Sequence, residues 1–108
     1  MREQFRSEYL LFLETLRGYY PNAVLIIAVG PMLNNSWPPG YAAWTSIQED
    51  VGTVVNERQQ SGDADIHFLV HTPQQAPYGE DWHPTEATHR QMAAELLAFI
   101  DSLAIFPG

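Results

Sequence analysis

The chain has 108 residues, of which 45% are hydrophobic and 12% aromatic, so it can build one core but is too short for two domains. Its 13 acidic residues outnumber its five basic residues, and the formal net charge of −8 argues against nucleic acid or an anionic membrane surface as a partner. The absence of cysteine excludes disulfides, thiolate catalysis and cysteine metal sites.

The first twenty residues, MREQFRSEYLLFLETLRGYY, have apolar side chains at steps of three or four. This pattern predicts an amphipathic helix that ends at Gly18 or just before Pro21, and it does not resemble a signal peptide. No apolar run approaches the ~18 residues of a membrane span. The continuous β-rich run AVLIIAV, residues 23–29, predicts a central strand that is buried on both faces.

The remaining elements alternate in the same way. The loop PMLNNSWPPG leads into a second predicted helix over residues 41–60, and a second strand follows over residues 64–71. After a long loop, a last helix begins near Pro84 and Thr85. The order helix, strand, helix, strand, helix predicts an α/β fold with parallel strands and helices on the faces of the sheet.

The predicted sheet is incomplete. Two strands are fewer than the about five or six of an average sheet, and a strand as apolar as residues 23–29 needs a ladder partner on each side. We therefore expect that these residues are the C-terminal part of a larger α/β domain, or that a second chain completes the sheet. A second copy pairing at this edge would make a homo-oligomer.

The two loops that follow the strands are the places where a parallel sheet binds ligands. His83 lies in the second loop, directly before the helix start at Pro84, with Asp81 and Glu80 two and three positions earlier. An acid that accepts the Nδ1 proton would leave Nε2 free to act as a general base. The alternative is that both acids only favour the helix N-terminus and that His83 is solvated.

Two further histidines, His67 and His71, point to the same side of the second predicted strand. No acid lies near them in the sequence, so we predict neither a metal site nor a cofactor.

The segment GEDWHPTEATHRQMAAEL resembles the last sequence block of the SGNH, or GDSL-type, hydrolases, in which an acid, a spacer, the catalytic His and a Pro lead into the C-terminal helix. Its DWHP, followed by TH and MA, is similar to the acetyl xylan esterases of the second carbohydrate-esterase family. Upstream, LRGYYPNAVLIIAVGPM resembles the stretch that follows the family's Gly-x-Asn-Asp block. The resemblance covers most of the chain and implies a partial three-layer α/β/α fold of the flavodoxin-like, SGNH-hydrolase type.

The resemblance implies that His83 is the catalytic base. The group that orients it stays open among Glu80, Asp81 and a main-chain carbonyl, which has this role in some members of the family. Trp82 would form the aromatic wall for the sugar ring. The neighbouring loop adds two substrate-binding candidates, Trp37 and Asn35, although Trp37 could equally be a loop anchor.

The family's nucleophile, in an N-terminal Gly-Asp-Ser block, and its oxyanion donors have no match in this sequence. Residues 61–63, SGD, precede a strand instead of following one. We therefore expect that residues 1–108 form the C-terminal part of an SGNH-type hydrolase domain, and that the Ser comes from a missing or separate N-terminal half. The isolated chain should be inactive or nearly so.

The implied reaction is the deacetylation of acetylated sugars, xylan or related esters by a serine esterase that needs no cofactor. The alternative is a non-catalytic module that binds sugar or pairs with another chain. An esterase of this kind would be secreted or periplasmic, but the residues in hand include no signal peptide.

Overall fold

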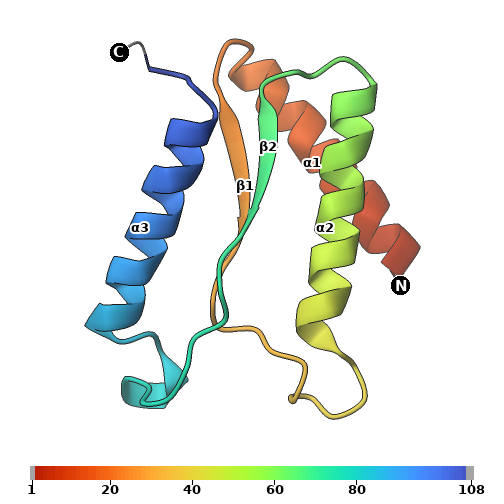
Figure 1. Ribbon diagram of the computed structural model, residues 1–108. Helices are drawn as coiled ribbons and strands as arrows, with labels where there is room; N and C mark the ends of the chain where they lie inside the picture. The colour runs from red at the N-terminus through yellow and green to blue at the C-terminus, as the bar shows by residue number, and fades with distance from the viewer. Residues whose placement is uncertain (1, 107–108) are drawn as a thin grey trace.

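The computed structural model describes residues 2–106, which form three α-helices, two strands and one short 3-10 helix (Figure 1). Their bounds are α1 Arg2–Tyr19, β1 Leu25–Val29, α2 Ala43–Gln60, β2 Ile66–Val70, η1 Glu80–Trp82 and α3 Glu86–Ser102. The predicted order of helices and strands is confirmed, and η1 is an addition within the second loop.

The two strands pair in parallel, as predicted, with Leu25 opposite Ile66 and Val29 opposite Val70. Main-chain hydrogen bonds extend the pairing beyond both ends, because Leu25 N donates to the oxygen of Asp65 at 2.8 Å and His71 N donates to that of Val29 at 2.9 Å. Within residues 2–106 the sheet has no third strand, so β1 and β2 each keep one edge without a ladder partner.

The hydrophobic core lies between the sheet and the helix pair α1 and α2. Alternate strand residues face it, since successive side chains of a strand point to opposite faces. The buried members of this core are Leu13, Ile27, Val51, Val54, Val55 and Ile66. The core thus joins α1 and α2 to one face of the sheet, whereas α3 takes no part in it.

The third helix lies on the other side of the sheet (Figure 1) and is held by few contacts. The ring of His67 on β2 lies edge-on to that of Phe99, with 6.4 Å between centroids. Among the residues of α3, Thr88 alone is buried, and Leu97 is 63% exposed.

The prediction that residues 23–29 are buried on both faces is wrong for one face. Ala28 is exposed and Ile26 is only half-buried, whereas Ile27 and Val29 are buried. The reason is that α3 is loosely packed and that no described strand lies beyond β1.

Ion pairs fasten α1 to the rest of the fold. Arg17 donates to Asp63 in the turn between α2 and β2, with 2.9 Å between Nη2 and Oδ1, and Arg58 binds the same carboxylate. The hydrogen bond from Arg17 lowers the pKa of Asp63. Nearer the N-terminus, Arg6 donates to the buried Asp50 at 2.7 Å.

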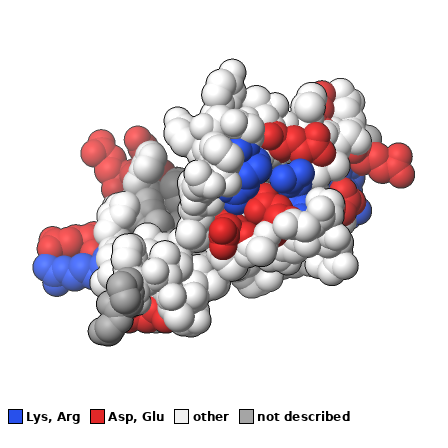
Figure 2. Space-filling view, turned by 90° about the horizontal axis from the view of Figure 1, so that it is seen from above, with Lys and Arg blue, Asp and Glu red and all other residues white. Residues whose placement is uncertain are grey.

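Figure 2 shows basic and acidic side chains lying side by side on the face that it views. Each arginine of the fold forms an ion pair with a carboxylate. No helix within residues 2–106 has the length and apolar character needed to cross a membrane.

Candidate active site

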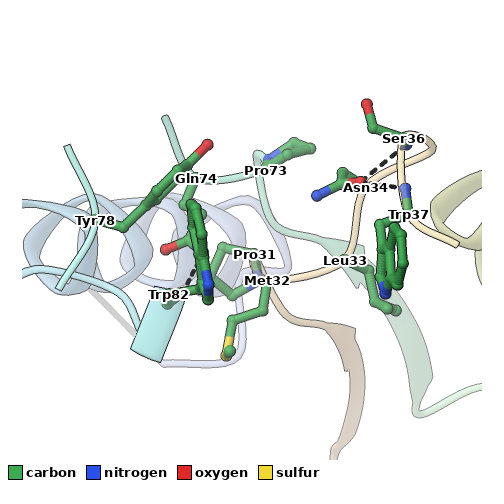
Figure 3. A pocket seen from close by; sticks show the side chains of 10 residues that line it. All are labelled: Pro31, Met32, Leu33, Asn34, Ser36, Trp37, Pro73, Gln74, Tyr78 and Trp82. Atoms are coloured by element: carbon green, nitrogen blue, oxygen red, sulfur yellow. Dashed lines mark hydrogen bonds between the residues drawn. The ribbon is translucent and has the colours of Figure 1, made fainter. Parts of the chain in front are cut away.

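A cleft of about 500 Å³ opens at the carboxyl ends of the two strands, between the loop after β1 and the loop after β2 (Figure 3). This is where the α/β pattern predicts a ligand site. Trp37 and Trp82 stand on opposite sides of the cleft and are 73% and 71% exposed, so both indoles can receive a flat ring. The cleft is lined by Pro31, Met32, Leu33, Asn34, Ser36, Trp37, Pro73, Gln74, Tyr78 and Trp82.

The first loop is shaped by two consecutive asparagines with different tasks. Asn34 lines the cleft, and its Oδ1 accepts hydrogen bonds from the main-chain N–H groups of Ser36 at 2.8 Å and Trp37 at 3.1 Å. This local turn, typical of Asn, fixes the backbone that carries the Trp37 indole.

Asn35, the predicted substrate-binding residue, does not line the cleft. Its Oδ1 accepts from Thr45 N at 3.0 Å and its Nδ2 donates to Thr45 Oγ1 at 2.8 Å. Asn35 therefore holds the first turn of α2, and Asn34 presents its carboxamide at the cleft instead.

The second loop ends in a tight turn over residues 79–83. Gly79 N donates to the oxygen of His83 at 2.8 Å, and His83 N donates to the oxygen of Glu80 at 3.0 Å. Between them, Asp81 and Trp82 both have left-handed backbone conformations, with φ of 53° and 64°. For residues other than glycine this conformation costs about 1–2 kcal/mol each. The turn is therefore a strained feature that needs support.

The strained turn directs the indole of Trp82 toward the cleft. The ring packs against Tyr78, with 5.4 Å between centroids and an angle of 56° between the planes. Close approach favours glycine at position 79, since a Cβ there would lie 3.0 Å from the oxygen of His83.

The imidazole of His83 is oriented by the main chain. Its Nδ1 lies 2.8 Å from the carbonyl oxygen of Glu80, and because a carbonyl only accepts, Nδ1 carries the proton. Nε2 is then the acceptor nitrogen. Within residues 2–106 no carboxylate hydrogen-bonds to this ring, and the side chains of Glu80 and Asp81 are exposed. Of the three alternatives for the orienting group, this geometry matches the carbonyl.

A second histidine lies near the same end of the sheet but has a different environment. His71 is buried, and its Nδ1 lies 2.9 Å from Oε1 of Glu95 on α3. Glu95 also accepts from the main-chain N–H and the hydroxyl of Thr72. Hydrogen bonds from Thr72 and His71 lower the pKa of Glu95. The group ties α3 to the end of β2, and its acid was not found from the sequence because it lies on a distant helix.

Gln74 also lines the cleft and was not singled out from the sequence. Its Nε2 donates to the main-chain oxygen of Trp82 at 2.6 Å, and its own N–H donates to the oxygen of Pro31 at 2.9 Å. It thus connects the two loops. No local pattern marks such a residue, since glutamine is ordinary in loops.

No protein-family model matches the sequence. Over 102 residues, 92% of this chain, the sequence is 40% identical to the cellulase/esterase CelE of Acetivibrio thermocellus, of which it spans 12%. A family two carbohydrate esterase from Clostridium thermocellum, solved in complex with cellohexaose, has a TM-score of 0.82 and 35% identity over 96% of this chain and 31% of that chain.

A family 2 carbohydrate esterase with a carbohydrate-binding domain, from Corynascus thermopiles (Myceliophthora fergusii), shares the fold with a TM-score of 0.85 at 24% identity, over 97% of this chain and 31% of that chain. These matches confirm the predicted α/β class and the resemblance to carbohydrate esterases of the second family. The chain spans less than a third of the length of each of these relatives.

Proposed function

We propose that this chain, whose sequence and fold match one part of the family two carbohydrate esterases, supplies the general base and an aromatic sugar-binding cleft to a serine esterase that deacetylates carbohydrates. The observation that carries the proposal is the geometry of His83. Its Nδ1 proton is held by the Glu80 carbonyl, so Nε2 is a proton acceptor, and His83 directly follows Trp82, which lines the cleft.

The reaction would proceed in two steps. As the nucleophilic Ser hydroxyl attacks the acetyl carbonyl carbon, Nε2 of His83 accepts its proton, and the imidazolium then donates that proton to the departing sugar oxygen. In the second step His83 takes a proton from a water molecule that attacks the acetyl-Ser. Acetate leaves, the proton returns to the Ser oxygen, and the enzyme is regenerated.

The nucleophile and the oxyanion donors would come from an N-terminal part of the hydrolase domain, in the same polypeptide or a separate chain. The free edge of β1 supports this proposal, because an apolar strand with one neighbour exposes a row of main-chain donors and acceptors that a further strand could pair. The exposed Ala28 on the open face of β1 is also suited to contact with added structure.

The substrate would be an acetylated glycan. The related esterase from Clostridium thermocellum was solved with cellohexaose, a chain of pyranose rings with apolar C–H faces. In this chain, Trp37 and Trp82 expose indole faces on either side of the cleft, where they can stack on such rings.

The experiment is to produce the chain together with the N-terminal half of a related family two esterase and to measure hydrolysis of p-nitrophenyl acetate and acetylated xylan. His83→Ala should lower kcat by ~10²–10⁴, the usual contribution of a general base. The matched control is His89→Ala on α3, which removes an exposed imidazole that does not belong to the 79–83 turn and should leave the rate unchanged. Equal rates for the two variants would remove His83 from the mechanism.

A second candidate function is a module that binds sugar or pairs with another chain without catalysis. The observation in its favour is that both indole walls of the cleft belong to residues 2–106 and need no second chain. Binding of xylo-oligosaccharides without hydrolysis, even with candidate partner halves present, would favour this function. Sedimentation at several concentrations would separate pairing between copies from a monomer.

A further inference from the structure

We propose that Gln74 is a positioning residue that holds the peptide unit between Trp82 and His83, and thereby sets the placement of both side chains. The consequence for catalysis rests on the proposed function, whereas the structural effect does not. Gln74 lies nine residues before His83, and its hydrogen bond to the turn comes from its side chain.

The peptide unit between Trp82 and His83 is held at both ends. Its oxygen accepts the 2.6 Å hydrogen bond from Gln74 Nε2, and its N–H donates to the oxygen of Glu80 at 3.0 Å. The same Glu80 oxygen accepts the Nδ1 proton of His83. Any rotation of this peptide plane would therefore disturb the tautomer and direction of the His83 ring.

The turn needs support from outside. Asp81 and Trp82 are both in the left-handed region, and residues other than glycine stay there only where surrounding structure holds them. The other hydrogen bonds of the turn join residues 79–83 to one another. Within residues 2–106, the bond from Gln74 is the one hydrogen bond that ties the turn to another segment. Gln74 is itself anchored, since its N–H donates to the oxygen of the buried Pro31.

The carboxamide of Gln74 carries a desolvation cost. Its Oε1 is buried and has no hydrogen-bond partner within residues 2–106. A buried acceptor without a partner costs about 1–3 kcal/mol, and an apolar side chain of similar length would avoid this cost. An apolar side chain has no hydrogen-bond donor, whereas Nε2 of Gln74 donates to the Trp82 oxygen. The role of Gln74 is therefore this hydrogen bond.

The test compares Gln74→Met and Gln74→Glu with Gln75→Glu in the full chain. Gln75 is the exposed neighbour and does not line the cleft, so its variant controls for the added charge. The readout is nuclear magnetic resonance of the Trp82 indole N–H, assigned with Trp82→Phe, and of the His83 ring. Both Gln74 variants should shift these signals at pH 7, and Gln75→Glu should not.

In the Gln74→Glu variant, low pH should restore the hydrogen bond to the Trp82 oxygen. The ordinary pKa of a Glu carboxyl is about 4.3. Once the pH is low enough to protonate the carboxyl at position 74, its O–H can donate to the Trp82 oxygen. The signals of Gln74→Glu should then return toward those of the wild type at the same pH, whereas those of Gln74→Met stay displaced. If Gln74→Met does not fold, this reversible return within one protein decides the matter. If the Trp82 and His83 signals of Gln74→Glu match those of the wild type at every pH of the titration, the proposal is overturned.

Activity is measured separately, with the complementary half present. Gln74→Met should lower kcat by roughly tenfold, in line with the cost of a misplaced catalytic group, with a smaller change in KM. If the complemented wild type has no esterase activity but the signals respond to Gln74, the proposed function fails and the positioning role stands. If the wild type is active and the signals do not respond, the positioning role fails alone.

Discussion

His83 donates its Nδ1 proton to the main-chain oxygen of Glu80, 2.8 Å away, although the carboxylates of Glu80 and Asp81 belong to the same short turn. The ring is thus oriented by a neutral carbonyl dipole and not by a carboxylate charge. We therefore expect Glu80→Gln and Asp81→Asn to keep the activity of the completed esterase within about threefold of the wild type. Loss of a carboxylate that orients a catalytic His can cost ~10⁴ in kcat.

The two amide variants are suited to this question because they preserve the backbone. Asp81 has φ of 53°, and Asn tolerates this conformation as well as Asp does. The measurement is kcat with p-nitrophenyl acetate in the complemented enzyme, with His83→Ala as the inactive reference. A hundredfold loss in either variant would mean that the carboxylate reaches the ring in the complete enzyme.

Gly79→Ala should reduce activity more than stability. The added Cβ would lie 3.0 Å from the oxygen of His83 and 3.4 Å from that of Pro84, so the turn must shift by a few tenths of an ångström. We expect kcat to fall by roughly tenfold, because the shift moves the base itself. The matched control is Gly18→Ala in α1, where a Cβ meets nothing within 4 Å.

In the control, alanine should stabilise the helix by up to about 1 kcal/mol, which raises Tm by about 4–8 °C in a domain of this size, and activity should not change. Thermal unfolding by circular dichroism and kcat are measured on both variants. Wild-type activity in Gly79→Ala would show that the turn absorbs the methyl group without moving His83.

The helices and strands could be predicted because their signals are local. Apolar residues at steps of three or four marked α1, and the β-rich run marked β1, within a few residues of the observed bounds. The place of the cleft followed from topology alone, since parallel strands bring their carboxyl ends to one edge.

The details of the site could not be predicted, because they depend on backbone conformation and on distant residues. The left-handed φ of Asp81 and Trp82 leaves no mark in the sequence, and these residues form the turn in which the Glu80 carbonyl meets the His83 ring. Two adjacent asparagines cannot be told apart by composition, although one lines the cleft and the other binds Thr45. Apolar content predicts burial of β1 on both faces, but it does not show which face other elements leave open.

The proposed sugar-binding cleft predicts that Trp37→Ala and Trp82→Ala each weaken the binding of cellohexaose by about fivefold, equivalent to ~1 kcal/mol of lost stacking. Both indoles are more than two-thirds exposed and stand on opposite sides of the cleft, so each has a face free for the proposed stacking on a sugar. Calorimetry measures the affinities. Tyr20→Ala is the control, because this 57% exposed aromatic ring precedes β1, at the other end of the strands. Equal affinities for all three variants would show that the sugar binds elsewhere.

Glu95 should make the attachment of α3 sensitive to acid. Hydrogen bonds from Thr72 and His71 lower its pKa below the ordinary value of 4.5. A carboxyl whose pKa is lower in the folded state stabilises the fold above its unfolded pKa, and this contribution is lost as the pH falls through the folded value. Glu95→Gln should therefore lower Tm at pH 7, by about 4–8 °C for each ~1 kcal/mol of unfolding free energy that is lost. The difference in Tm between this variant and the wild type should become smaller below about pH 4.5.

Thermal unfolding from pH 3 to pH 7, followed by circular dichroism, checks this expectation. The control is Glu86→Gln on the same helix, whose side chain is 79% exposed and whose ion pair with Arg90 lies at the surface. Other carboxylates with lowered pKa, such as Asp63, are present in all variants and cancel in the comparison. A constant offset in Tm between Glu95→Gln and the wild type at every pH would contradict the assignment, because the tie would then stabilise α3 without depending on the charge of Glu95.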